Sequence, residues 1–331
     1  MAGTRHHIIP KFLQRGFASR TQEKKVWTWM YQKGVEPKEI ITTNVGVEQH
    51  FYGRDGEPNA DDEITLLENS QYSPLLERLR TEIAPTGVVE VYEPLLANFI
   101  SHLCTRTKNF RESIYQSSDY LITAIDSYLS DLSNIKKFLL KHPAQSENHI
   151  KLKSIILSNP NILDTKKTEV QTLIHFLFSS IKSELPRLIK ESHNDALVKI
   201  PASKVRADVY RQMRWFLYTF NKPLVILGDS GCLFEIAGEK NYKIFNDKGE
   251  KLRQVFLPIA ANKVLIGTLS GTTKLDIKKL NRSMAKCSQG FFIYSKFSEG
   301  MAKLVPLIGT ESEILSQVKL EQIINEVLQS Y

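Results

Sequence analysis

The 331-residue chain lacks a long apolar run. A membrane-spanning helix needs ~20 consecutive apolar residues, and a secretory signal peptide needs an apolar core near the N-terminus. In the first twenty positions only Ile8 and Ile9 stand together. We therefore expect no membrane segment and a cytoplasmic location.

Cysteine is scarce and scattered. The chain has three cysteines, Cys104, Cys232 and Cys287, which lie far apart. An odd number at these spacings excludes a disulfide framework and a zinc site of the CxxC type. This usage is typical of a reducing compartment.

The motifs that most directly indicate an activity are also absent: there is no P-loop, no GxGxxG after a strand, no HExxH and no GxSxG. The opening HHIIP superficially resembles HNH nucleases, but no downstream Asn and second His stand at the required short spacing. Asp229 and Glu235 loosely resemble a restriction-nuclease hairpin, yet the Glu-x-Lys element is missing, because Glu239 directly precedes Lys240. We expect no cofactor and no metal site from sequence, although residues distant in the chain could converge on a metal.

Acidic residues are fewer than basic ones, 36 against 44, which gives a net charge of +8. Such a charge favours a polyanionic partner, nucleic acid and DNA in particular. The alternative is a basic protein that binds no nucleic acid. The 42% hydrophobic and 24% charged content is that of a globular chain.

The periodicity predicts strands at both ends of the chain. Residues 24–33 alternate with period two, which is typical of a strand, and residues 39–53 form a second extended run. Residues 61–195 are helical in pattern, with a long helix over about 94–132, a kink or break expected at Pro74 and a break expected at Pro186. After residue 200, short β-rich runs separated by Gly, Asn and Asp predict an antiparallel meander.

These elements predict an α+β fold, in which an antiparallel sheet is built from N- and C-terminal strands with a large helical block between them. We expect a single domain over residues 1–331, interrupted by a helical or loop insertion at 133–164. Closing the two β regions into one sheet would bring the N-terminal histidines near the GDSG turn at 228–231.

The segment HHIIPKFLQRGF resembles the start of a bacterial family known as domain of unknown function 4238, which opens with His-His-x-x-Pro-x-Phe-x-x-x-x-Phe. The strand with Trp27 and Trp29, Glu68 in LLENS, and the RTKNFR, GDSG, FLPIA and LNRSMAK segments are also similar to that family. The family usually has Asp-x-Pro where this chain has Asp229, Ser230 and Gly231. The resemblance covers most of the chain and supports the choice of residues, but it implies no activity.

Four residues are the predicted catalytic groups: His6, His7, Glu68 and Asp229. Adjacent histidines in an extended segment point to opposite faces, so one site takes at most one of them easily; the other reading is that a histidine only holds the N-terminus in place. Asp229 follows an apolar strand, where a carboxylate gains a fixed backbone and open access, although an Asp in Asp-Ser-Gly commonly caps its turn. Two interpretations are open for Glu68: it is a functional carboxylate, or it is one partner of a structural salt bridge.

Five further residues are predicted to bind substrate: Arg15, Arg106, Arg111, Tyr52 and Trp27. Arg111 with Lys108 and Arg15 could grip phosphates, while an ordinary solvated helix face explains them equally well. Arg106 and Arg111 are five residues apart on the long helix, so they need not share a target. Tyr52 and Trp27 are expected to be exposed and available for stacking on bases.

Two classes of function fit these features. The first is a nucleic-acid-directed hydrolase, an activity that would suit an antiviral defence effector. In it a carboxylate activates water to cleave an N-glycosidic bond, or a metal held by His and carboxylates cleaves a phosphodiester. The missing metal motif favours the glycosylase-like version, with Asp229 as the carboxylate and Glu68, Asp61 or Asp62 in reserve. The second is a non-catalytic nucleic-acid-binding or regulatory protein. Asp229→Asn is expected to reduce the rate by roughly two to four orders of magnitude with little effect on folding.

Overall fold

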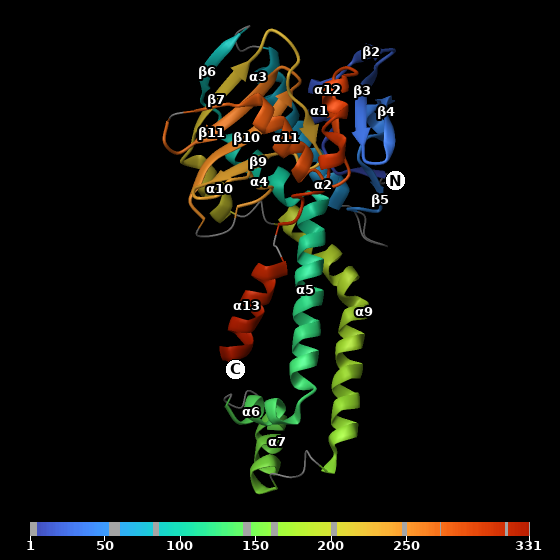
Figure 1. Cartoon of the computed structure of the whole chain (residues 1–331), viewed down its shortest axis with the longest axis vertical. Helices are drawn as coiled ribbons and strands as arrows, with labels where there is room; N and C mark the ends of the chain where they lie inside the picture. Colours follow the sequence, from blue (N-terminus) through green and yellow to red (C-terminus); the bar gives the residue numbers. More distant parts are fainter. Residues whose placement is uncertain are drawn as a thin grey trace. The chain divides into compact units, whose positions relative to one another are not determined.

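The computed structural model describes residues 5–52, 60–81, 86–141, 147–159, 165–199, 204–246, 250–271, 273–314 and 317–330. The chain divides into two compact units (Figure 1). The larger unit contains Met1–Arg111 and Lys190–Ile314, and the smaller contains Glu112–Ile189 and Leu315–Tyr331. The prediction of one domain with an insertion at 133–164 stays a prediction, since compactness alone does not show which parts fold together.

The larger unit contains a five-stranded antiparallel sheet in the order β6-β7-β11-β10-β9. Its two central strands are buried along almost their whole length, because they are rich in Val, Ile and Leu and both faces of the sheet are covered. The strands are β6 (Gly87–Val91), β7 (Arg214–Thr219), β9 (Leu233–Ile236), β10 (Leu252–Ala260) and β11 (Lys263–Thr268).

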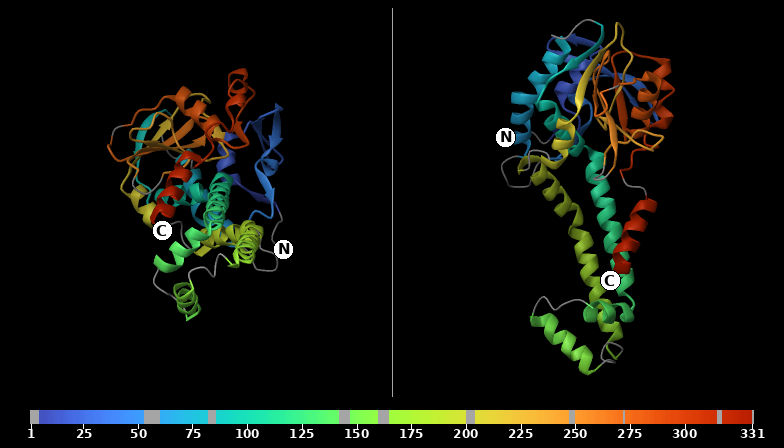
Figure 2. Two further views of the ribbon diagram at one scale, coloured as in Figure 1. Left: turned by 60° about the horizontal axis from the view of Figure 1, so that its bottom comes forward. Right: turned by 90° about the vertical axis from the view of Figure 1, so that its left-hand side faces the viewer.

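A second sheet joins the beginning of the chain to its end in the order β2-β3-β12-β8, with β4 pairing β3. Figure 2 shows the N-terminal strands, in blue, in the same unit as the orange C-terminal segments. Tyr31 of β3 lies opposite Phe292 of β12, and their buried rings stack with centroids 5.0 Å apart. The predicted α+β fold, with an antiparallel sheet built from N- and C-terminal strands, is therefore confirmed. The strands are β2 (Arg20–Gln22), β3 (Lys25–Gln32), β4 (Val35–Ile41), β8 (Leu227–Gly228) and β12 (Phe291–Tyr294).

The N-terminal segment is held by its own short sheet. β1 (Arg5–His7) pairs antiparallel with β5 (Val47–Gln49). Pro10 then precedes α1 (Lys11–Gln14), whose apolar residues enter the main core. The start of the described chain is thus an ordered part of the fold. The 3-10 turns η1 (Arg15–Phe17) and η2 (Thr42–Asn44) complete this region.

The helices of the larger unit pack against the two sheets and supply the site described below. A π-helical turn, η3 (Glu68–Tyr72), joins α2 (Ala60–Leu67) to α3 (Ser73–Thr81). The helix continues through Pro74, which follows the π-helical turn by two residues, so the chain is distorted there but not broken. The others are α4 (Leu95–Thr105), α10 (Lys204–Arg211), α11 (Ile277–Cys287), α12 (Glu299–Ala302) and the 3-10 turn η4 (Val305–Leu307).

The smaller unit is helical throughout its described residues. α6 packs against α9 through a small apolar cluster formed by Leu129, Leu132, Ile135, Val170 and Ile174. Pro186 lies inside α9 without ending it, so the expected break there is wrong. Its helices are α5 (Lys108–Leu129), α6 (Leu132–Lys141), α7 (Glu147–Ser158), α9 (Lys167–Lys199) and α13 (Gln317–Ser330), and the division between the units falls within α5 and α9.

Short helices thus occupy the described part of the expected insertion at 133–164; residues 142–146 and 160–164 lie outside the described ranges. Across the described ranges, no helix combines enough length with enough apolar character to cross a bilayer.

Candidate active site

The two N-terminal histidines face opposite ways on β1, as expected for an extended segment. His6 is 2% exposed, and its Nδ1 accepts the backbone N–H of Tyr52 at 2.9 Å. Its ring also contacts the Tyr52 ring, with centroids 5.5 Å apart. His6 therefore holds the N-terminal strand against the segment that follows β5.

His7 is only half-buried, and its hydrogen bond fixes its tautomer. Nδ1 lies 3.1 Å from the carbonyl oxygen of Val45; because a carbonyl only accepts, Nδ1 carries the proton and the lone pair is on Nε2. Burial lowers the His7 pKa to about 4, and the nearby positive charges of Lys11, Arg106 and Arg5 contribute in the same direction. At neutral pH His7 is thus an uncharged base in cationic surroundings.

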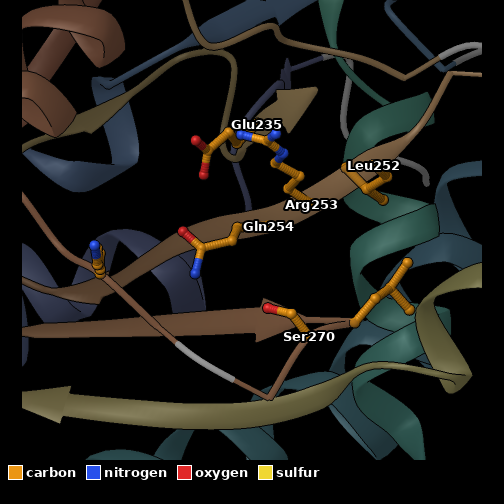
Figure 3. A pocket seen from close by; sticks show the side chains of 7 residues that line it. Glu235, Leu252, Arg253, Gln254 and Ser270 are labelled. Atoms are coloured by element: carbon orange, nitrogen blue, oxygen red, sulfur yellow. The ribbon is translucent and has the colours of Figure 1, made fainter. Parts of the chain in front are cut away.

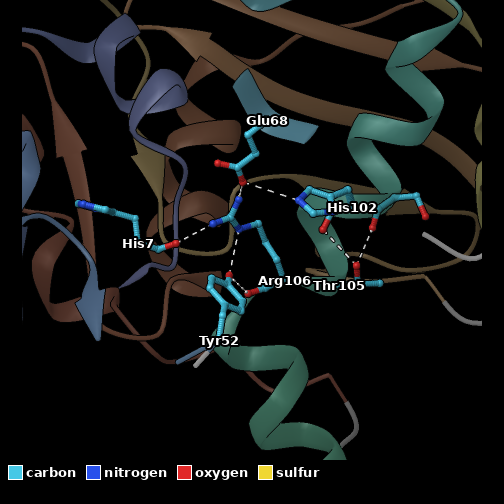
Figure 4. A network of polar contacts seen from close by, with 7 residues as sticks. His7, Tyr52, Glu68, His102, Thr105 and Arg106 are labelled. Atoms are coloured by element: carbon cyan, nitrogen blue, oxygen red, sulfur yellow. Dashed lines mark hydrogen bonds and ion pairs between the residues drawn. The ribbon is translucent and has the colours of Figure 1, made fainter. Parts of the chain in front are cut away.

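Glu68 forms the centre of a buried polar network. It is the first residue of the π-helical turn η3, a local distortion that is frequent at functional sites. Its Oε1 forms an ion pair with Nη1 of Arg106, and Figure 4 shows the two side chains meeting head-on. The Glu68 side chain is 13% exposed and that of Arg106 3% exposed, so the pair lies at the edge of the core.

Arg106 links this carboxylate to the N-terminal strand. Its Nη2 donates to the backbone carbonyl of His7 at 2.7 Å, and its Nε donates to the Tyr52 hydroxyl at 3.1 Å (Figure 4). The arginine stands where α4 ends, so helix geometry and three separate partners fix its guanidinium. One side chain therefore aligns Glu68, His7 and Tyr52.

His102 is a member of this network that the sequence analysis did not identify. Its Nε2 lies 3.7 Å from Glu68 Oε1, too far for a hydrogen bond but close enough for a charge on either group to affect the other. Burial lowers its pKa to about 4, so it is neutral at pH 7. His102 and Arg106 stand four residues apart on one helical face, and this spacing was the signal that could have revealed it.

Comparison with known proteins places these residues in a family. The model of the family described as Protein of unknown function (DUF4238) matches residues 5–298, which is most of the chain. The chain belongs to the DUF4238 family. No curated protein and no solved structure matches the chain. The matched range contains every residue of the network around Glu68.

Asp229 of this DUF4238 protein is not the accessible carboxylate that we expected. It is 6% exposed, and it accepts three backbone N–H groups: Gln289 at 2.7 Å, Gly290 at 2.6 Å and Phe291 at 3.2 Å. Burial raises its pKa to about 6 although these three bonds favour the charged form. Asp229 thus fixes the segment that enters β12, because both of its oxygens are used by backbone donors.

The expected approach of His7 to Asp229 stays a prediction. One observation bears on it: the Lys108 ammonium lies 2.5 Å from Glu48 of β5 and also stabilises the ionised Asp229 carboxylate. His6 is the residue opposite Glu48 in the β1–β5 pairing. Lys108 therefore lies within electrostatic range of both segments.

Glu235 stands apart from Asp229 in the fold. It lies on β9 in the five-stranded sheet, whereas Asp229 follows β8 in the other sheet. Figure 3 shows Glu235 in a surface pocket of about 340 Å³. The pocket is lined by Glu235, Leu252, Arg253, Gln254, Leu269, Ser270 and Lys274. The two residues of the loose restriction-nuclease resemblance thus belong to different sheets.

Arg111 is half-buried, and its guanidinium is engaged by structural partners. Its three nitrogens donate to His193 Nδ1 at 2.9 Å, the Phe51 carbonyl at 2.8 Å and Asn194 Oδ1 at 3.0 Å. Its guanidinium also lies 3.7 Å from the Phe51 ring centroid. We expected a guanidinium available to bind phosphate, and this expectation is wrong for Arg111, because its nitrogens donate to groups within the protein.

The remaining predicted residues divide between buried and exposed. Tyr52 is 1% exposed, so the expectation of an exposed stacking ring is wrong for it. Arg15 is exposed in η1, and Trp27 is partly exposed on β3. Asp62 is exposed on α2, and the side chain of Asp61 lies outside the described residues. Of the five residues predicted to bind substrate, Arg15 and Trp27 keep the expected accessibility.

No set of three metal-ligating side chains from His, Cys, Asp and Glu comes together within the described ranges. What the arrangement offers instead is a carboxylate held by an arginine, a neutral imidazole with an available lone pair, and exposed cations beside it.

Proposed function

We propose that this DUF4238 protein is a nucleic-acid-directed hydrolase in which Glu68, rather than Asp229, activates water. The observation that carries the proposal is the Arg106 guanidinium, which joins Glu68 Oε1 to the carbonyl of His7. It joins the carboxylate to the backbone of the N-terminal strand that carries the half-buried His7, whose ring points away from Glu68 in Figure 4.

The geometry of Glu68 suits a general base. Oε1 is removed from solvent and held by Arg106. Oε2 has no hydrogen-bond partner among the described residues, so this oxygen is available to a water molecule. The arginine favours the charged form of the carboxylate, which is the form that a general base requires.

The surroundings of His7 suit an anionic substrate. Arg5 and Lys11 are exposed, and together with Arg106 they impose a positive potential on the His7 ring. The neutral Nε2 accepts a hydrogen bond while the two exposed cations attract phosphate. The net charge of +8 extends this preference to a polyanion.

Hydrolysis of an N-glycosidic bond fits these groups. The oxygen of a water molecule bonds to the sugar carbon, the carbon–nitrogen bond to the base breaks, and the proton that Glu68 removes from water passes to the departing base. Cleavage of a phosphodiester by a bound metal is the second candidate, but the described residues bring together no three ligands for it. An activity of either kind would suit antiviral defence.

The test is incubation with modified and unmodified DNA and with RNA, each with and without EDTA. A glycosylase-like enzyme leaves abasic sites in the presence of EDTA, and these break on later alkali treatment. A metal-dependent nuclease produces direct breaks that EDTA abolishes. Glu68→Gln is expected to slow the reaction by roughly two to four orders of magnitude, while Glu63→Gln, an exposed residue of the preceding helix, keeps the wild-type rate.

A second variant protects the test against misfolding, since Glu68→Gln also weakens a buried ion pair. Lys11→Ala changes an exposed side chain, and it is expected to raise KM with little change in the melting temperature. Lys222→Ala, an exposed lysine elsewhere on the larger unit, is its control. Absence of any product from all substrates would favour the non-catalytic binding protein instead, and full activity of a folded Glu68→Gln protein would remove Glu68 from the mechanism.

A further inference from the structure

A row of aromatic side chains lies on one face of the sheet formed by β2, β3 and β4. Residues two apart on a strand share a face, so Lys25, Trp27 and Trp29 point to the same side of β3. The Trp29 ring meets the ring of Phe297, which is 51% exposed, at a centroid distance of 5.3 Å. We call Trp27, Trp29 and Phe297 the aromatic platform.

Arg20 adds a fixed cation to this platform. It lies opposite Trp27 in the β2–β3 pairing, and its guanidinium carbon stands 4.5 Å from the Trp27 ring centroid. Glu39 of β4 holds it there: Arg20 Nε donates to Glu39 at 3.0 Å, and the Ser19 hydroxyl donates to the other Glu39 oxygen at 2.6 Å. Aromatic rings and guanidinium planes are the two surfaces on which proteins stack unpaired bases.

The charge around the platform complements a polyanion. Lys25 lies on the platform face, and Lys296 directly precedes Phe297; both are exposed. Glu39 is the acidic residue beside Trp27 and Trp29, and its charge is already paired with Arg20. Phosphate groups that pass along this face thus meet the ammonium groups of Lys25 and Lys296, while the charge of Glu39 is paired with Arg20.

The spacing of the rings favours a single strand over a duplex. At ~3.4 Å of rise per residue, Trp27 and Trp29 are about 7 Å apart along β3, roughly twice the separation of stacked bases in a duplex, ~3.4 Å. Rings at this spacing receive bases that have been spread apart, and such bases occur in single-stranded segments.

We propose that the aromatic platform binds the unpaired bases of single-stranded nucleic acid. This inference deepens the proposed function and rests on it, because the platform would hold the strand on which the hydrolase acts. The site lies on the sheet face, separate from the network around Glu68, so binding and cleavage are measured independently.

The experiment measures binding of labelled oligodeoxythymidine and oligouridine of about 15 nucleotides by fluorescence anisotropy, with a duplex of the same length as a comparison. All proteins carry Glu68→Gln so that the probe stays intact. Trp27→Leu and Trp29→Leu keep an apolar side chain, although a smaller one, and remove the rings. Because Trp29 also packs against the main core, the melting temperature of each variant is measured alongside its affinity. Each is expected to weaken single-strand binding by roughly 5- to 150-fold, the fold-change that corresponds to about 1–3 kcal/mol per stacked base, and to leave duplex binding unchanged.

Tyr92→Leu is the matched control, because Tyr92 is an aromatic residue with 83% exposure that follows β6 of the other sheet. Tryptophan fluorescence gives a second readout: of the three tryptophans, Trp215 is 5% exposed, so quenching by unlabelled oligonucleotide reports on Trp27 and Trp29. Quenching that disappears in the double variant supports the platform.

Three results overturn the inference. If both tryptophan variants bind single strands as tightly as the parent protein, the platform is not the binding site. The proposed hydrolase activity is then still tested separately, by its reaction products. Failure of the parent protein to bind either single strand also removes it. Loss of self-association or of a protein contact in the variants, with unchanged oligonucleotide affinity, assigns this face to a protein partner. Failure of the platform and failure of the proposed hydrolase are therefore distinguishable. Cleavage with unchanged binding in the tryptophan variants excludes the platform alone, and platform binding without cleavage excludes the hydrolase alone.

Discussion

At the scale of single residues, Asp229 gives the sharpest prediction about stability. Asp229→Asn places an amide NH2 against backbone N–H groups of residues 289–291 that now donate to a carboxylate. At least one buried donor loses its acceptor, which costs about 1–3 kcal/mol. We expect the urea midpoint to fall accordingly. This reverses the expectation from sequence that folding would change little.

The control for Asp229 is Asp119→Asn, which alters an exposed side chain 3.8 Å from Lys182. Surface pairs of this kind contribute about 0–1 kcal/mol, so the two midpoints should separate clearly. If Asp229→Asn is as stable as wild type yet inactive on a substrate that wild type cleaves, the three N–H bonds are of little structural weight and Asp229 returns as the catalytic carboxylate.

Part of the site was predictable at this scale and part was not. Glu68 and His7 were identified because a carboxylate within an apolar helical run and a histidine in an ordered N-terminal motif both require a partner. The sequence does not show that Arg106 is that shared partner, since it lies 38 residues beyond Glu68 and 99 beyond His7. Asp229 and Arg111 were misjudged because local sequence does not reveal which backbone groups the fold brings to a side chain.

At the scale of elements, Arg80 connects helix α3 to strand β10 and to helix α1. From α3 it donates to Ile259 of β10 at 2.7 Å and to Phe12 and Leu13 of α1 at 2.7 and 3.0 Å. Arg80→Lys leaves at least two of these carbonyls without a charged donor, each worth about 1.5–3 kcal/mol. We expect the free energy of unfolding to fall by about 3–6 kcal/mol, measured by urea denaturation.

Arg78→Lys on the same helix is the matched control, because Arg78 is partly exposed and pairs only with Glu93 among the described residues. It should change the midpoint little. Equal effects of the two substitutions would show that Arg80 does not hold α1 and β10 together.

The elements themselves were predictable where the pattern was long. β3 was identified from the period-two alternation of its residues, and β10 and β11 were identified from apolar runs that the fold buries along almost the whole strand. β6 was missed: GVVEV is a short edge strand with two exposed valines and no alternation. The predicted helix over 94–132 is two helices, because the Thr107 hydroxyl accepts the N–H of Phe110 and starts α5 anew.

At the scale of the whole molecule, the net charge of +8 predicts salt-dependent binding of nucleic acid. Arg15→Ala removes an exposed cation, and each lost phosphate contact reduces the log–log salt slope by about one unit. The measurement is anisotropy at several salt concentrations. Arg111→Ala is not an equivalent test, because it removes three hydrogen bonds within the protein and therefore lowers stability as well as charge. An unchanged slope and affinity in Arg15→Ala would exclude Arg15 from the interface.

Stability of the larger unit should decrease on mild acidification. Burial lowers the pKa values of three histidines, His7, His102 and His193, to about 4, whereas an unfolded histidine titrates near 6.5. Between these values the unfolded chain binds more protons than the native one, so the free energy of unfolding falls as the pH falls. Asp229 acts in the opposite direction, because its pKa is raised to about 6: its stabilising contribution is present below about 3.8 and is lost as the pH rises through 6.

The destabilising effect of the three histidines exceeds the stabilising effect of the one aspartate, so the free energy of unfolding falls between pH 7 and pH 5. We expect the melting temperature to fall by several degrees, at about 2–4 °C for each 1 kcal/mol in a domain of this size, measured at constant ionic strength. His7→Gln removes one of the three groups and should flatten the curve, while His175→Gln, whose side chain is 75% exposed, should leave it as it is. A melting temperature that is constant or rises over this range would mean that the histidines remain hydrated or become charged in the native state, and the neutral His7 on which the proposed site depends would be lost with them.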